Sequence, residues 1–358
     1  MLMGVLLVLS TAISGCATLS YYRQSITGQL QILAQRQDMQ TLVLAPETPE
    51  SRKAQLQAVP ELLRFASDQL ALPDNGSYRT FVALEQSFVA WNVFATPGLS
   101  LDGVRWCYPI AGCFGYRGYF SEAAARAEAG HLRASGHDVY VGGVAAYSTL
   151  GWFKDPIVSS MLRADRLDFA ALLFHELAHQ RLWLPDDTDL NEAFAETVAR
   201  IGVGKLAQTW GDIDLQRFHE RAQQDDQFFA LVLRHKQLLA SLYATNQPDG
   251  RKLELKQQQF TMLRADYRML KAGSGDPGRF DHWLETDLNN AKLLAVSAYR
   301  DLMPGLLQVY QSSSRDLETF YGLLRRLQDC SLVDRHQWVR SGGTLPECRA
   351  PGRNPPDS

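Results

Sequence analysis

One apolar stretch of the chain, from Phe169 to Leu184, contains two histidines and a glutamate near its centre. Leu, Ala and Phe surround them, a composition typical of a helix that packs inside a protein. A buried polar group without a partner costs on the order of a few kcal/mol. Any fold that accepts this stretch must therefore supply partners for His175, Glu176 and His179.

The spacing of these polar residues indicates a metal-binding helix. His175 and His179 are four positions apart, so in a helix they lie on one face with Cβ atoms about 5–6 Å apart, and both imidazoles can reach one ion. Glu176 lies one step round the helix, where it can approach a water on that ion without being a ligand. The His-Glu-x-x-His pattern is typical of zinc sites in which the glutamate is the general base. We therefore expect Zn²⁺ as the cofactor.

A catalytic zinc site of this kind takes three protein ligands and leaves a fourth position for water. Glu192 and Glu196 lie in the next predicted helix, on one face. Their neighbours Asn191 and Phe194 indicate that this face is packed, which favours roles at the metal. Local roles stay open for both acids: Glu192 can complete a capping box begun by Asp189, and Glu196 can be a solvated surface acid.

The N-terminal block differs from the rest of the chain. Leu2 to Ile13 is apolar and uncharged, too short to span a bilayer, and fits the core of a signal peptide. The small residues before Cys16 resemble the lipobox of bacterial lipoproteins. This resemblance implies removal of residues 1–15, a lipid on Cys16 and anchoring at the periplasmic side of a membrane, with Ala17 favouring the outer membrane. An ordinary secretory signal is the alternative.

Four further cysteines lie in the part of the chain that would be exported, where disulfides persist: Cys107, Cys113, Cys330 and Cys348. Four cysteines allow three pairings. The local pairs Cys107–Cys113 and Cys330–Cys348 are favoured because short loops are closed at the lowest entropic cost. Four unpaired thiols are the alternative.

Composition excludes one class of partner and allows a substantial core. The chain has 358 residues and a formal net charge of −3, with both signs mixed along its length. No basic face calls for nucleic acid. The helical and strand-like residue patterns along the chain predict an α+β, mostly helical protein. Its predicted segments include helices over 21–39, 51–72, 121–134 and 283–302, a helical hairpin over 213–270, and short strands over 78–84, 88–95 and 138–147.

Several segments together resemble a known family. His175 to Gln180, Leu190 to Glu196, the run Gly-Tyr-Arg-Gly-Tyr-Phe at 115–120 and the run from Gly142 to Gly151 look like those of predicted zinc aminopeptidases found as proteobacterial lipoproteins, a group of gluzincin metallopeptidases. The resemblance extends up to about Ala291. It implies a zincin-like catalytic core with a small antiparallel sheet over 77–204. N-terminal helices over 16–76, a helical region over 205–349 and a disordered tail over 350–358 would complete the chain.

The same resemblance assigns roles to the motif residues. It makes His175, His179 and Glu192 the zinc ligands, Glu176 the base, and Glu196 the acid that holds His175 from behind. Such an arrangement hydrolyses peptide bonds, so the expected partners are a peptide or protein substrate and, through Cys16, a lipid membrane.

Substrate contacts are predicted from the segment before the zinc helix. A strand from Gly142 to Gly151 can pair with an extended peptide backbone, which makes Ala146 and Tyr147 the predicted substrate-binding residues. This segment carries no acid to bind a free amine, whereas the large gluzincin aminopeptidases bind it with a glutamate on the corresponding strand.

A tyrosine on a later helix supports the oxyanion in many such enzymes. Tyr299 is the predicted residue because it shares a predicted helix with Asn289. A tyrosine packed in a helical core is the alternative.

Four functions fit a two-histidine, one-carboxylate site. The favoured one is an aminopeptidase. The others are an endopeptidase acting on unfolded envelope proteins or cell-wall peptides, a non-catalytic lipoprotein with a structural metal, and a non-haem iron oxygenase. The last is disfavoured because oxygenases place these ligands on a β scaffold and because Glu176 would then have no role.

Overall fold

Two helices at the centre of the molecule carry the predicted metal ligands, α5 (Arg166–Arg181) and α6 (Thr188–Trp210). The computed structural model describes residues 21–108, 112–163, 165–210, 215–297 and 301–345. The side chain of Asp165 caps α5 by accepting from the backbone N–H groups of Leu167 and Asp168. Both helices bury residues on several sides, because α3 (Glu50–Leu70) and the C-terminal helices pack around them.

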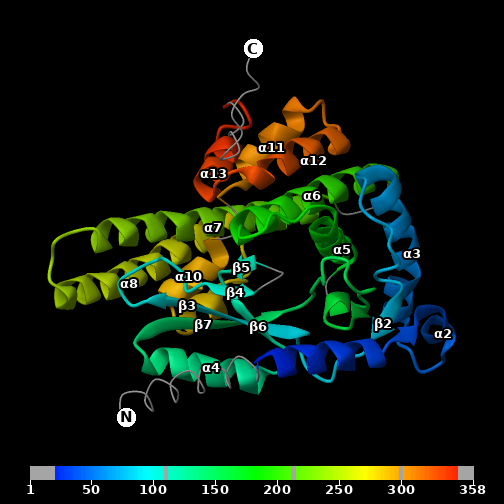
Figure 1. Cartoon of the computed structure of the whole chain (residues 1–358), viewed down its shortest axis with the longest axis horizontal. Coiled ribbons are helices and arrows are strands. Elements are labelled where there is room, and N and C mark those ends of the chain that lie inside the picture. The colour runs from blue at the N-terminus through cyan, green and yellow to red at the C-terminus, as the bar shows by residue number, and fades with distance from the viewer. Residues whose placement is uncertain (1–20, 109–111, 164, 211–214, 298–300, 346–358) are drawn as a thin grey trace, which may run out of the picture.

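A three-stranded antiparallel sheet lies below these helices in Figure 1, with the strand order β6 (Arg117–Tyr119), β3 (Ala90–Pro97) and β7 (His137–Val144). One face packs Trp91 and Val93 against α4 (Glu122–Ala134), whose N-terminus is capped by Ser121. Helix α10 (Asn290–Ser297) packs against β3 and β7 through Phe94, Ala291 and Ala295.

The remaining strands are short. β1 (Gln37–Asp38) pairs antiparallel with β2 (Thr80–Val82), which pairs parallel with β8 (Ile157–Val158). β4 (Trp106–Tyr108) and β5 (Gly112–Phe114) form a separate pair closed by the disulfide Cys107–Cys113. That predicted local disulfide is confirmed. Cys348, needed for the other predicted pair, lies outside the described residues.

The C-terminal half is helical. α7 (Leu215–Tyr243) and α8 (Asp249–Ser274) lie side by side in Figure 1, as the predicted hairpin. The other elements of the chain are α2 (Met39–Leu44), η1 (Met161–Arg163), α9 (Asp281–Glu285), α11 (Met303–Ser312), α12 (Leu317–Arg325), η2 (Arg326–Asp329) and α13 (Leu332–Arg340). α11, α12 and α13 stack on the side of α6 away from the three-stranded sheet (Figure 1). The α+β, mostly helical fold class is confirmed, and no helix in the described ranges is long and apolar enough to cross a membrane.

Three predicted segments are corrected. The helix predicted over 21–39 ends at residue 34, because Asp38 joins β1 and caps α2 by accepting from the N–H of Thr41. The helix predicted over 283–302 is broken between α9 and α10, where Asp287 has a φ of 41°.

The third correction concerns the strand expected to reach Gly151. β7 ends at Val144. Beyond it, local side-chain bonds replace strand pairing: Ser160 donates to the carbonyl of Ala145, and Asp155 accepts from the N–H of Thr149. The predicted division of the chain into segments stays a prediction, and α6 runs through the expected boundary at residue 204 to Trp210.

Candidate metal site

The packing of α5 against α6 brings three ligand atoms together. The two Nε2 atoms of His175 and His179 lie 3.1 Å apart, and Glu192 Oε2 lies 3.3 Å from the first and 3.6 Å from the second. Ligand atoms placed tetrahedrally at about 2.0–2.1 Å from a zinc ion are about 3.3 Å from one another. The three atoms therefore fit a single metal ion, and the three residues form a group able to hold one.

The charges around the imidazoles favour a cation at this point. Burial alone lowers the pKa of His175, but the carboxylates of Glu192, Glu176 and Glu196 outweigh it and raise the pKa to about 9. Burial alone raises the pKa of Glu192, but the two imidazoles hold it well below its ordinary value. Carboxylates that attract a proton to His175 also attract a metal ion that takes its place.

Glu176 lies beside the three ligand atoms without being one of them. Its side chain is buried, with 6% of the residue exposed. Burial raises its pKa, although both imidazoles act in the opposite direction. A carboxylate with a raised pKa next to a metal site is suited to take up and release a proton.

A chain of charged residues supports His175 from behind. Glu196 Oε2 lies 3.9 Å from His175 Nδ1, and Glu196 Oε1 accepts from Arg200 Nε at 3.1 Å. Arg200 in turn donates two bonds of 2.8 Å to Asp226 on α7. This paired arrangement limits the positions open to Glu196, and an acid behind a ligating imidazole orients the ring and raises its basicity.

The connection between the two helices is held by Asn191, the residue just before the third ligand. Its Oδ1 accepts from the N–H of Leu184 at 2.8 Å, and its Nδ2 donates to the carbonyl of Leu184 at 2.7 Å. Asn191 is 1% exposed. These bonds tie the start of α6 to the chain that leaves α5, so they set where Glu192 lies relative to the histidines.

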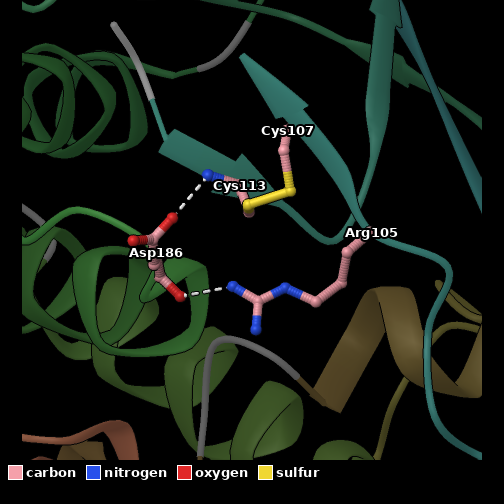
Figure 2. The surroundings of a disulfide bond; sticks show 4 residues. All are labelled: Arg105, Cys107, Cys113 and Asp186. Atoms are coloured by element: carbon pink, nitrogen blue, oxygen red, sulfur yellow. Dashed lines mark hydrogen bonds between the residues drawn. A yellow bond between two sulfur atoms is a disulfide. The ribbon is translucent and has the colours of Figure 1, made fainter. Parts of the chain in front are cut away.

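Two aspartates in the same connection bind elements distant in the sequence. Figure 2 shows Asp186 against the disulfide hairpin of β4 and β5: its Oδ1 accepts from the N–H of Cys113 at 2.7 Å, and its carbonyl accepts from Arg105 at 2.9 Å. Asp187 pairs with His336 on α13 at 2.8 Å. The turn that joins the ligand helices is thus fixed from both sides.

A cleft of about 920 Å³ opens onto the three ligand residues. Its walls come from the helix over 21–34, the ends of the three-stranded sheet, and α5, α6 and α7. Near His179 the lining is aromatic: the ring of Trp183 lies 5.7 Å from that of His179 and 5.7 Å from that of Phe114. A cleft of this size lies within the range of ligand-binding clefts, roughly 300–1,000 Å³.

The predicted site residues are placed as follows. His175, Glu176, His179, Glu192 and Glu196 come together as expected, and Ala146 and Tyr147 line the cleft on the segment after β7 rather than on a strand. Tyr299 and Cys16 lie outside the described residues.

Sequence reasoning assigned no role to Phe114, Tyr116 or Trp183, all of which line the cleft. The glycine- and aromatic-rich run that contains the first two was the only available signal. Such a run does not reveal which rings face the metal site.

Known protein families include one that matches most of this chain. A family described as "Putative aminopeptidase" matches residues 20–339, a range that includes both ligand helices and the whole cleft. The chain belongs to this family. No curated protein and no solved structure matches it.

Proposed function

We propose that this protein is a zinc-dependent aminopeptidase. The observation that carries the proposal is the convergence of His175 Nε2, His179 Nε2 and Glu192 Oε2 at mutual distances of 3.1 to 3.6 Å, inside a cleft and next to Glu176. Membership of the aminopeptidase family supports the peptide substrate class.

Each residue of the site has a step in the reaction. His175, His179 and Glu192 would hold the zinc ion, which would supply a bound water with a pKa lowered to about 7 and polarisation of the scissile carbonyl. Glu176 takes a proton from the attacking water and passes it to the nitrogen of the leaving amine. Glu196 keeps the imidazole of His175 in its ligating orientation. The cleft holds the peptide against these groups.

One observation favours an endopeptidase as the second candidate. Apart from the acids at the metal site, the acids of the described chain that line the cleft are Asp168 and Asp225, and both are paired with arginines: Asp168 with Arg221 at 2.6 Å and Asp225 with Arg279 at 2.9 Å. An aminopeptidase has to recognise the free amine of its substrate. In an aminopeptidase, backbone carbonyls and neutral side chains of this cleft would have to bind that amine. An endopeptidase needs no such recognition of a free amine.

Three measurements test the function. The purified protein should contain one zinc per chain and hydrolyse aminoacyl reporters with a free amine but not N-blocked peptides. Cleavage of only the blocked peptides would favour the endopeptidase. Glu176→Gln should keep its zinc and lose activity by several orders of magnitude. An unchanged rate of hydrolysis in this variant would indicate that the metal has a structural role instead of a catalytic one.

We further propose that the mature chain begins at Cys16 and is anchored by lipid on the periplasmic side. Tyr21, five positions later, lines the cleft. Five residues span at most about 18 Å, so the cleft would open close to the membrane surface. Metabolic labelling with palmitate should mark the wild-type protein and not Cys16→Ala; labelling of both would refute the anchor.

A further inference from the structure

The helix over residues 21–34 is fixed to the body of the protein along one side. Gln24 Oε1 accepts from the N–H of Phe120 at 3.3 Å. One turn later, a Cβ at Gly28 would lie 2.4 Å from the ring of Phe120, so a larger residue would displace that ring. Ile32, after another turn, is buried in the main core. These contacts repeat every four residues, so the opposite face of the helix points away from the body.

The outward face carries an apolar row, Tyr22, Ile26 and Leu30, which we call the outer stripe. The three residues follow one another at intervals of four, so they lie on one side of the helix. They are 36%, 59% and 58% exposed, and they are three of the twelve large apolar side chains exposed in the described chain. Single apolar residues on a surface are common, whereas an aligned row indicates contact with an apolar partner.

The charges of this segment favour a partner with negative charge. Between Cys16 and Asp38 the only charged residues are Arg23 and Arg36, although the whole chain has a formal net charge of −3. Both arginines are exposed. Arginine side chains can lay their apolar stems along an apolar surface and direct their charged ends to anions. A helix with an apolar row, arginines and no acid is typical of segments that lie in a bilayer interface.

Two exposed aromatic rings adjoin the end of this helix. Arg36 Nη1 donates to the carbonyl of Lys154 at 3.4 Å. The two residues before Lys154 are Trp152 and Phe153, and all three are exposed. Tryptophan is enriched where proteins meet the headgroups of a bilayer. The exposed apolar surface therefore continues beyond the helix.

We propose that the outer stripe (Tyr22, Ile26 and Leu30) lies on the surface of a lipid bilayer that contains anionic lipids. The proposed lipid anchor selects this occupant. Cys16 lies five positions before Tyr21, and five residues span at most about 18 Å, so an anchored chain holds this helix close to the bilayer. Contact with the bilayer removes the apolar side chains of the stripe from water, which stabilises one orientation of the protein on the membrane.

The first test measures binding of the mature chain with Cys16→Ala, so that the lipid does not mask the weaker contact. The probe is vesicles of equimolar phosphatidylethanolamine and phosphatidylglycerol, and binding is measured by co-sedimentation. Replacing Ile26 and Leu30 together by serine should lower the partition coefficient on the order of 10- to 100-fold, because two apolar side chains no longer enter the interface. Arg23→Gln should lower it about five-fold at low salt and have no effect with phosphatidylcholine alone.

Replacing Met262 and Met269 together by serine is the matched control. Both methionines are exposed on α8 and lie seven positions apart, so they also form an apolar pair on one side of a helix. This variant should bind the vesicles as the wild type does. Both double variants should keep the wild-type melting temperature, because the replaced side chains are exposed.

A second readout uses the full-length lipidated protein in vesicles that contain a phospholipid with a photoactivatable diazirine group. Cross-links mapped by mass spectrometry should fall on the peptide that contains Ile26 and Leu30, and none should fall on α8. Absence of cross-links to this helix would overturn the proposal.

Two further outcomes would also overturn it. One is an equal loss of vesicle binding in the methionine control. The other is loss of self-association in solution, in place of loss of vesicle binding, when Ile26 and Leu30 are replaced, which would assign the stripe to a contact between two copies of the chain. If Cys16 carries no lipid but vesicle binding still depends on the stripe, the anchor fails and this surface stands. Neither assay uses turnover, so the peptidase function is tested separately.

Discussion

Replacing Asn191 by leucine should both destabilise the fold and weaken metal binding. The change removes the two bonds that Asn191 makes with the N–H and the carbonyl of Leu184 and leaves both backbone groups buried. An unsatisfied buried group costs about 1–3 kcal/mol, so the free energy of unfolding should fall by about 2–6 kcal/mol. Because the next residue is Glu192, part of this loss should appear as lower zinc affinity, about tenfold per 1.4 kcal/mol.

The assay is urea unfolding of the wild type and the variant, with and without zinc, together with competition titration against a chelator. Thr197→Val is the matched control on the same helix. Thr197 is buried and donates at 2.7 Å to the carbonyl of Ala193, which lies within the helix, so its loss should cost less than about 1.5 kcal/mol and leave zinc affinity unchanged. A loss below about 1 kcal/mol in Asn191→Leu, or equal zinc affinity in both variants, would refute the reasoning.

Three further predictions address other contacts. Glu196→Gln should lower zinc affinity about 10- to 100-fold in the same chelator titration, and unchanged affinity would remove Glu196 from the support of His175. Replacing Cys107 and Cys113 together by serine should lower kcat, because the hairpin that they close binds Asp186 in the turn between the ligand helices. Dithiothreitol should reproduce this loss in the wild type. Full activity of the reduced protein would show that the hairpin does not help to position these helices. Burial raises the pKa of the Asp155 carboxyl from 3.8 to about 6, so the folded state binds the proton more tightly and stability falls, by up to about 3 kcal/mol, as pH rises from about 4 to 6. Unfolding of Asp155→Asn should lack this pH dependence, and parallel profiles would refute it.

The sequence predicts the part of the site that depends on local spacing. His175, Glu176 and His179 lie in one helix, so their relative positions follow from the helical repeat. Glu192 and Glu196 follow in the next helix after a short connection, which restricts them to the same side of α5. The spacing made both acids candidates for the metal site, and the resemblance to the aminopeptidase family assigned their separate roles.

The elements that failed are those decided by long-range contacts. Residues 283–302 have helical spacing throughout, but Asp287 adopts a positive φ, and the N–H of Asn290 at the start of α10 donates at 2.9 Å to Asp138, 152 positions earlier. The position of the β4–β5 hairpin depends on its disulfide and on the bond from the N–H of Cys113 to Asp186, 73 positions later. No periodicity along the chain encodes such a contact.

The pairing of Asp187 with His336 has a consequence for the order of events in biosynthesis. Arg335, the neighbour of His336, also donates to the carbonyl of Pro185 at 3.0 Å. The turn between the ligand helices therefore receives contacts from α13, about 150 positions further along the chain. A chain that stops before α13 carries all three residues able to hold a metal ion but lacks these contacts, so we expect full metal affinity only after nearly the whole polypeptide has been made.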